Sequence, residues 1–470
     1  MGTSKARAAA KPAKKAAPEV PSRRIPQKTF IIDNGAYTMK AGYASSDATT
    51  TEEALSACTT IPNCLVKTRD NRIVVGPQIS STVNDWNEAM FRRPVEKGYL
   101  VNWEAEREIW EQSFFEEKAT ARNKGIRIPT PEDTTLVLTE APNTMPVLQR
   151  NTDEMVMEEW GFGGYVRCLG PTLNAWNEVH SLFGDPLRKP ETDILPADCL
   201  LVVDSGYSHT TVTPVYRGLP IQRAIRRLDI GGKHLTNYLK EIVSMRQYNM
   251  VDESYIMNEV KESVCFVTND FTTDMEKTWK ANLKRQAASD DSIVVDFVLP
   301  DPNANKKGFM RPHDPLLEAK KKKGALSGLS SEILSEDVLV LGNERFAVPE
   351  LLFRPSDIGM KQAGVPEMIL QSLSVLPAGL HAALLANVLV VGGNAGIPGF
   401  MERLEAELRQ ITSSECVVRV RRAEDPICST WLGGSRLANN REELSKVAIS
   451  RSEYQEYGSG WAGRRFAGNI

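Results

Sequence analysis

An apolar, strand-like run that passes directly into an acid and a glycine occurs twice in this chain. Residues 29–32 lead into DNG at 33–35, and residues 200–203 lead into DSG at 204–206. A strand that ends in Asp-x-Gly can present backbone N–H groups to a phosphate while its carboxylate faces a hydrated Mg²⁺. Two such strand ends that face one another would form a clamp.

A third turn of this kind lies far downstream. The apolar run at residues 388–391 is followed by GGNAG, which contains Gly392, Gly393 and Gly396. Because glycine has no side chain, the backbone at these positions can approach a ligand closely. Each fragment alone is typical of an ordinary turn. The three in this order predict a clamp that closes around a nucleotide.

Length and composition restrict the class of protein. With 470 residues, 41% of them hydrophobic, the chain can bury a large core in roughly two to three domain-sized units. The net charge of −3 means that any nucleic-acid-binding patch must be local. No apolar run approaches the roughly 18 residues of a membrane helix, so we expect neither membrane insertion nor secretion. The seven scattered cysteines are expected to be reduced thiols, not disulfides or a zinc site.

From about residue 30 to residue 457 the chain resembles actin. The motifs that carry the resemblance follow actin's order: DNGAYTMKAG at 33–42, RRPVEKG at 92–98, NW at 102–103, LTEAP at 138–142, DSG at 204–206, RRLDIGGKHLTNYL at 226–239, GNERF at 342–346 and WLGGSRLA at 431–438. The resemblance implies the α/β fold of actin, heat-shock chaperones and sugar kinases. Two pseudo-repeated α/β domains would lie around a nucleotide cleft, with insertions.

A finer set of motifs is similar to the sixth class of nuclear actin-related proteins. These are DNGAYT at 33–38, IPNC at 61–64, WGFGGY at 160–165 and VDSGYSHT at 203–210. Members of that class are subunits of the Swr-type chromatin remodeller, which exchanges a variant histone into nucleosomes. The resemblance implies a non-catalytic scaffold in the nucleus, present in the cytoplasm before import. Its expected partners are the helicase-like motor subunit, a small zinc-finger subunit and nucleosomal DNA.

The expected domains are a tail at 1–28, a first half at 29–199 with inserted stretches at 115–133 and 180–197, a second half at 200–457 with an insertion at 300–336, and a tail at 458–470. The first tail carries eight Lys or Arg against one acid and should be disordered. It is either a solvated terminus or an arm for nuclear import or DNA contact. Within the halves, strands and helices alternate, which predicts α/β layers.

An insertion and a shortened link, both relative to actin, and one aromatic cluster indicate which partners the chain can contact. The insertion holds four consecutive lysines, Lys320, Lys321, Lys322 and Lys323, for which we expect either solvation or contact with DNA or a partner. The apolar cluster of Trp160, Phe162 and Tyr165 is a second candidate contact, although such aromatics more often belong to the core. Only a short link at 67–72 stands where actin has a long loop that grips the next subunit, so we expect no filaments.

The resemblance assigns possible roles in nucleotide binding. The residues concerned are Asp33, Asn34, Gly35, Lys40, Asp204, Ser205, Gly206, Lys261, Glu262, Gly392, Gly393 and Gly396. Asp33 and Asp204 would hold water around Mg²⁺, and Lys40 would reach the phosphates of ATP or ADP. Lys261 and Glu262 match positions that contact ribose and adenine.

Hydrolysis requires an oriented water at the terminal phosphate. The glutamine that orients it in actin has no visible counterpart, because residues 151–197 contain no Gln. In the downstream turn Tyr207 replaces a carboxylate and Thr211 replaces a histidine. The nearby His209 is either a substitute for that histidine or an exposed turn residue, and we expect the second.

The upstream turn departs as well. Ala36 replaces a phosphate-binding hydroxyl and Tyr37 replaces a glycine, while Ile427 replaces the lysine that stacks on adenine. We therefore expect a nucleotide that is bound and not hydrolysed. Three alternatives stay open: an empty cleft in which Asp33 and Asp204 merely cap strand ends, a cycling actin-fold ATPase, and a filament-forming cytoskeletal actin.

Overall fold

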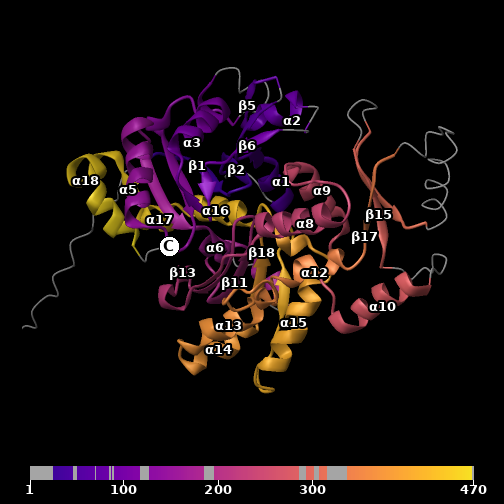
Figure 1. Ribbon diagram of the computed structural model, residues 1–470. Helices are drawn as coiled ribbons and strands as arrows, with labels where there is room; N and C mark the ends of the chain where they lie inside the picture. The colour runs from indigo at the N-terminus through magenta and orange to yellow at the C-terminus, as the bar shows by residue number, and fades with distance from the viewer. Residues whose placement is uncertain are drawn as a thin grey trace, which may run out of the picture.

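The computed structural model describes residues 25–45, 50–68, 70–83, 86, 89–116, 126–184, 195–284, 293–300, 306–314 and 336–467. Two α/β units, each built on its own sheet, lie one above the other in Figure 1. The predicted α/β class is confirmed, and the two large sheets have similar strand arrangements. Within the described part of the chain, none of the helices is both long and apolar enough to cross a membrane.

The first sheet has the strand order β20-β10-β9-β1-β2-β3. Its strands are β1 Lys28–Asn34, β2 Thr38–Tyr43, β3 Thr59–Pro62, β9 Thr134–Glu140, β10 Gly164–Leu169 and β20 Ile449–Ser450. β1 and β2 form an antiparallel hairpin, and β9 and β10 continue the sheet in parallel with β1.

The second sheet has the order β13-β12-β11-β18-β19, with β14 paired to β12. Its strands are β11 Cys199–Ser205, β12 Thr210–Tyr216, β13 Leu219–Pro220, β14 Arg226–Leu228, β18 Val388–Val391 and β19 Val420–Arg422. Again an antiparallel hairpin, β11 and β12, is followed by a parallel strand, β18. In the two hairpins Asp33 pairs with Lys40 and Asp204 pairs with Thr211, so the sequence repeat is also a repeat in space.

Helices cover both sheets. α7 Val179–Phe183 packs on the second sheet, and α2 Ile79–Thr82 packs with Val66 and Val74 outside both large sheets. Around the first sheet lie α1 Thr51–Ser56, α3 Trp103–Trp110, α5 Pro146–Glu154, α6 Gly170–Leu173, α16 Ser429–Asn439, α17 Arg441–Val447 and α18 Arg451–Phe466. Around the second lie α8 Gly232–Arg246, α9 Ser254–Val264, α10 Phe271–Lys284, α12 Glu344–Glu350, α13 Val365–Ser374, α14 Ala378–Leu385 and α15 Phe400–Ile411. The α3 and α5 helices each run on into a π-helical turn, at Glu111–Phe115 and Met155–Glu159.

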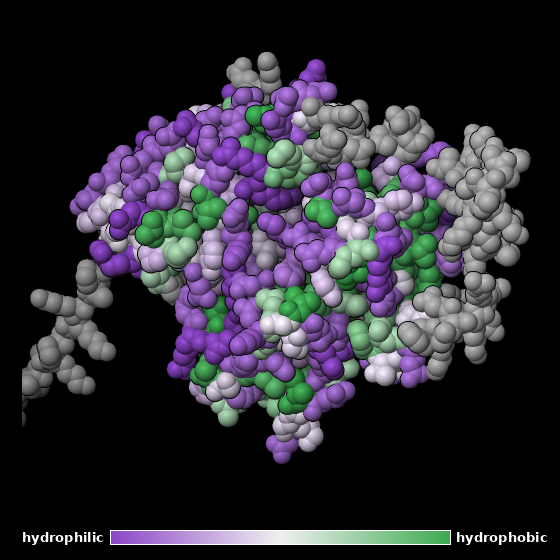
Figure 2. All heavy atoms as spheres, in the orientation of Figure 1, coloured by the Kyte–Doolittle hydropathy of each residue, from purple (hydrophilic) through white to green (hydrophobic). Residues whose placement is uncertain are grey.

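Three small sheets are added to this frame. They consist of β4 Leu65–Lys67, β5 Ile73–Val75 and β6 Met90–Arg92; of β7 Val95–Glu96 and β8 Tyr99–Leu100; and of β15 Val295–Val298, β16 Phe309–Pro312 and β17 Val338–Leu341. The short link predicted at 67–72 is the turn of the β4–β5 hairpin. The sheet of β15 and β17 stands at the right edge of Figure 1, and hydrophobic side chains gather beside it in Figure 2.

The end of the chain returns to the first sheet, so the predicted second half at 200–457 is wrong at its C-terminal boundary. Trp431 of α16 is completely buried in one cluster with Ile31. At Gly433 of the same helix a Cβ would lie 2.0 Å from the carbonyl oxygen of Leu173, so only glycine allows this close packing. β20 then pairs with β10.

Both predicted tails are also too long. Ile25 is buried and Pro26 accepts hydrogen bonds from Thr135 and Arg441, so the fold begins before residue 29. At the other end, residues 451–466 form α18, whose Phe466 packs edge-on against Tyr165 at 5.3 Å. Burial of this aromatic side chain holds the helix on the sheet.

The insertion at 300–336 and the aromatic cluster of Trp160, Phe162 and Tyr165 also differ from their predictions. The insertion at 300–336 contributes a strand, β16, that pairs with β15, while Lys320 to Lys323 lie outside the described residues. Phe162 and Tyr165 are completely buried, so they belong to the core and cannot contact a partner. Trp160 is partly buried and stacks on Trp110 at 4.6 Å.

We predict that Phe466→Ala lowers the free energy of unfolding by about 3–5 kcal/mol, because it leaves a cavity beside Tyr165. Urea denaturation of the full chain measures this change. Tyr457→Ala, on an exposed part of the same helix, is the control and should shift stability by about 0.5 kcal/mol or less. Equal effects of the two substitutions would contradict the packing of α18.

Candidate functional site

The carboxyl ends of β1, β11 and β18 meet around one cavity of about 520 Å³. All the residues predicted to bind nucleotide line this cavity, except Ser205. The side chain of Ser205 is buried behind the turn, where its hydroxyl contacts Thr210 at 2.9 Å and accepts from Asn394 at 3.1 Å. Its role is therefore to hold the turn.

Asp33 is oriented by residues from two neighbouring strands. The Thr139 hydroxyl, at the end of β9, donates to Asp33 Oδ1 at 2.8 Å and accepts from the Asn34 backbone N–H at 3.0 Å. Lys40 Nζ lies 3.9 Å from Asp33 Oδ2. These contacts fix one oxygen of the Asp33 carboxylate. The ammonium group of Lys40 lies beside the other oxygen, on the cavity wall.

Buried polar side chains form hydrogen bonds that hold the Asn34-Gly35 turn in place. Asn34 Nδ2 donates to Glu106 at 2.7 Å, and Asn63 Nδ2 donates to Asn34 Oδ1 at 3.1 Å and to the Gly35 carbonyl at 3.0 Å. Trp110 Nε1 also donates to Glu106, at 3.0 Å. Burial raises the pKa of Glu106 to about 7, and the hydrogen bonds only partly oppose this rise.

Asp204 faces the same cavity from the second sheet. Burial raises its pKa to about 7, the nearby charge of Asp33 adds to the rise, and Lys40 opposes it. A divalent cation held through water by Asp33 and Asp204 would favour the ionised carboxyl, so this pair fits the predicted Mg²⁺. Among the described residues there is no cluster of three or more His, Cys, Asp or Glu that could hold a metal directly.

The glycine-rich turn after β18 closes the floor of the cavity. Gly392 has φ of +91°, and a Cβ there would lie 2.4 Å from the Ser205 carbonyl oxygen and 2.9 Å from Asp204 Oδ1. Only glycine fits at this position. A Cβ at Gly393 or Gly396 would meet no atom within 4 Å, so the backbone of these two residues is open to the cavity.

Lys261 and Glu262 line the cavity from α9, but their polar groups already have protein partners. Lys261 Nζ donates to the Gly232 carbonyl, to Thr236 and to Asn258 at 2.8–3.3 Å. Burial lowers the pKa of this lysine. Glu262 accepts from Asn258 Nδ2 at 2.8 Å. The lysine therefore ties α8 to α9 at the cavity wall.

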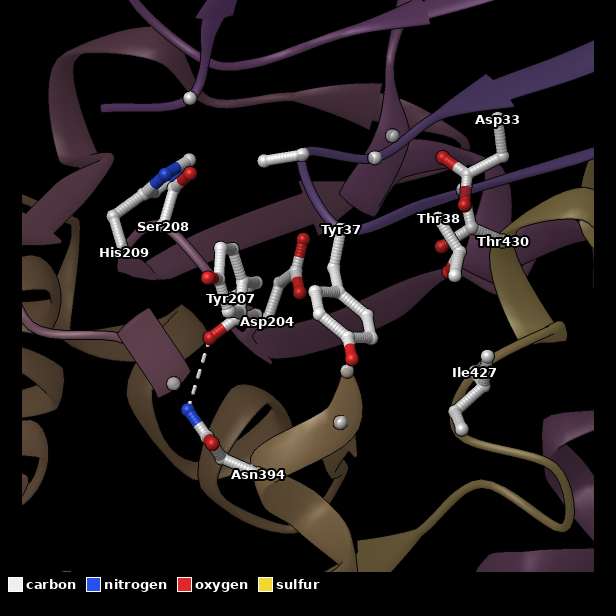
Figure 3. Close-up of a pocket in the computed structure, with 18 of the residues that line it drawn as sticks. Asp33, Tyr37, Thr38, Asp204, Tyr207, Ser208, His209, Asn394, Ile427 and Thr430 are labelled. Carbon is white, nitrogen blue, oxygen red and sulfur yellow. Dashed lines mark hydrogen bonds between the residues drawn. The ribbon is translucent and has the colours of Figure 1, made fainter. Parts of the chain in front are cut away.

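Two tyrosines project into the cavity in Figure 3. Tyr37 follows the first turn and Tyr207 follows the second, and their ring centroids are 4.8 Å apart. Burial raises the pKa of both phenols, although Arg93 opposes the rise. Both phenols are therefore uncharged. Their rings fill space where each turn would face a phosphate.

The prediction that His209 is an exposed turn residue is wrong. A Cβ on Gly98 would lie 2.3 Å from its ring, so the imidazole is pressed against the β7–β8 turn. Burial lowers the pKa of His209 to about 3, with the positive charge of Arg227 acting in the same direction. The ring is neutral and faces a backbone turn.

The end of β10 brings apolar residues to the described cavity wall. β10 ends at Leu169, and the residues that follow it into the cavity are Gly170 and Pro171; no glutamine lines the wall. Glu140 does line it, but it pairs with Arg167 at 2.6 Å and accepts from Gln149 at 2.7 Å. Burial raises the pKa of Glu140 to about 7, and Arg167 opposes the rise.

Several residues of the site were missed by the sequence reasoning. They are Thr139, Asn63, Glu106, Asn394 and Arg93. Thr139 stands in the motif LTEAP directly before a strand end, which was a usable signal. The others act through contacts with residues distant in the chain, for which the sequence offers no local pattern.

Comparison with known proteins adds an independent finding. The actin family model matches residues 25–467. A protein named Actin-like protein arp6 from Aspergillus fumigatus is 70% identical over the whole of both chains. Proteins named Actin-related protein 6 are 46% identical in Neurospora crassa, over 95% of each chain, and 34% identical in Dictyostelium discoideum, over 96% of each chain.

We predict that Asp204→Asn stabilises the protein without nucleotide at about pH 8 and that the gain shrinks toward about pH 5. The folded pKa of Asp204 is raised above its unfolded value, so wild-type stability falls as pH rises between about 4 and 7. Each pKa unit corresponds to about 1.4 kcal/mol, so the gain at the higher pH should be at least about 1 kcal/mol. Denaturation at both pH values tests this, with the exposed Asp252→Asn as control. A gain independent of pH would contradict the prediction.

Proposed function

This chain belongs to the actin family, on the branch of proteins named actin-related protein 6, and we propose that it is a non-catalytic scaffold subunit of a nuclear chromatin-remodelling complex. The complex would exchange a variant histone into nucleosomes. In this role the actin fold presents surfaces and insertions to other subunits, and the cleft stabilises the fold without turnover.

One observation supports the proposal that the cleft does not hydrolyse nucleotide. Both Asp-x-Gly turns are present and face one cavity, yet a tyrosine follows each turn, and the two rings are in contact within that cavity. Hydrolysis in this fold needs a polar group that orients water in line with the terminal phosphate. Where β10 ends, the cavity wall offers Gly170 and Pro171, which carry no such polar group.

The retained half of the site supports nucleotide binding. Asp33 and Asp204 would hold Mg²⁺ through water, Lys40 would lie beside the phosphates, and Gly393 and Gly396 would allow close approach of the backbone. Bound Mg²⁺ would neutralise the phosphates of ATP or ADP. These same features favour the second candidate function, an actin-fold ATPase with a cycling cleft, so turnover must be measured.

The proposed partners are the helicase-like motor subunit, a small zinc-finger subunit and the nucleosome. The lysines at 320–323 would contribute to DNA contact. The short β4–β5 hairpin supports the absence of filaments, because it replaces a long loop that would grip a neighbouring subunit. The proposed location is the nucleus, with a cytoplasmic pool before import, and no association with membranes.

We predict that purified protein turns over no ATP above the buffer background during a day-long incubation with labelled ATP and Mg²⁺. The nucleotide content, measured by denaturing the protein and chromatographing the released bases, should stay constant. Asp204→Asn is the matched control and should give the same background. Accumulation of ADP that is lost in this variant would overturn the scaffold proposal in favour of the ATPase.

We predict further that changing all four lysines at 320–323 to Glu weakens DNA binding by the assembled complex. The slope of log K against log salt should fall by about one for each lysine that contacts a phosphate. Arginine at the same four positions retains the charge and should leave the slope unchanged. An unaltered slope in the Glu variant would remove this segment from the DNA-binding surface.

A further inference from the structure

We infer that Arg93, Tyr37 and Tyr207 form a clasp that joins the two halves across the cleft and occupies the place of a terminal phosphate. The site would then accept a nucleoside diphosphate and exclude the triphosphate. This inference rests on the proposed function of the cleft as a nucleotide site without turnover.

Arg93 is anchored on the first half of the molecule. It lies between β6 and β7, and its guanidinium donates to the backbone carbonyl oxygens of Ala36, Tyr37 and Asn63 at 3.2–3.4 Å. These carbonyls belong to the first turn and to the loop that supports it. An arginine held at three carbonyls has little freedom to move.

From this anchor the same guanidinium reaches the second half. It lies over the ring of Tyr37 at 4.6 Å and over the ring of Tyr207 at 5.0 Å. Cation–π contacts of this kind are strongest where water is excluded. Because Tyr207 follows the second Asp-x-Gly turn, the arginine connects the two turns directly.

Tyr37 makes a second connection. Its hydroxyl accepts from Asn258 Nδ2 of α9 at 3.5 Å, and its ring meets that of Tyr207. Asn258 in turn donates to Glu262 and accepts from Lys261. The tyrosine thus connects the first turn to residues for which the resemblance to actin implies contact with ribose and adenine.

Two further sets of contacts join the halves. Tyr255 of α9 stacks on Trp86 at 3.8 Å, which joins α9 to the lobe of β4, β5 and β6. In the second set, Arg227 of β14 donates to the Lys97 carbonyl at 2.5 Å and lies over the Tyr99 ring at 4.8 Å. The halves are therefore joined by protein contacts that require no ligand.

This geometry decides how much of a nucleotide can enter. Aromatic rings with centroids 4.8 Å apart are in contact, so a phosphate cannot lie between them. The cavity, about 520 Å³ in all, is lined by both rings and also by Asp33, Asp204, Gly393 and Ile427. A triphosphate would have to separate the rings, whereas a shorter diphosphate would end before them.

Binding of ADP and ATP to the full chain, purified with its partner subunits where these are needed for solubility and freed of nucleotide, tests the clasp. With Mg²⁺ present, wild type should bind ADP at least about tenfold more tightly than ATP. Tyr37→Ala/Tyr207→Ala should gain ATP affinity and reduce this ratio to about threefold or less. Tyr37→Phe/Tyr207→Phe retains the rings and should keep the preference, as should the exposed control Tyr248→Ala.

Wild type that binds ATP as tightly as ADP, or that binds neither, overturns the inference, as does a double alanine variant that keeps the full preference. If the double alanine variant fails to fold, the preference of wild type for ADP over ATP is the result that tests the inference. Failure here is distinct from failure of the proposed function: equal binding without turnover removes only the clasp, and ATP turnover removes the scaffold proposal.

Discussion

Two carboxylates from different sheets, Asp33 and Asp204, share one cavity in which Lys40 is the cation close to both. Two like charges in a poorly solvated space are costly, so the cavity favours either a proton or a cation between them. The raised pKa of Asp204, about 7, reflects this cost. The surrounding structure, from the Thr139 hydroxyl to the Gly392 turn, serves to hold these two groups opposite one another.

In a cleft that cycles, the ligand joins the halves and its loss lets them part. Here Arg93 and the tyrosines supply that connection within the chain, reinforced by the stack of Trp86 on Tyr255. Contacts of this kind favour the closed state whether or not a ligand is present, since a ligand shifts an equilibrium only by its differential affinity for the two states. Contacts between the halves that need no ligand agree with the proposed role as a scaffold, in which the cleft does not have to open and close.

Much of the fold was predictable because it depends on local patterns. Apolar runs ending in DNG and DSG predicted β1, β11 and their turns, and the resemblance to actin is confirmed by the family match. The contacts that restrict the site were not predictable, because they join distant positions: Asn34 to Glu106 across 72 residues, and Arg93 to the Tyr37 carbonyl across 56. No periodicity or spacing records such a pairing. The environment of His209 was misjudged for the same reason, since its neighbour Gly98 lies on the other half.

The amino-acid sequence alone specifies the two repeated strand-turn units with their acids, glycines and following tyrosines, because each follows from which residue stands at the end of a strand. The return of the last helices to the first sheet, where Trp431 is buried and Gly433 packs on Leu173, emerged only in the folded molecule. So did the meeting of Tyr37 and Tyr207. Both outcomes depend on which surfaces pack together, and packing is settled by the shapes of whole elements in three dimensions.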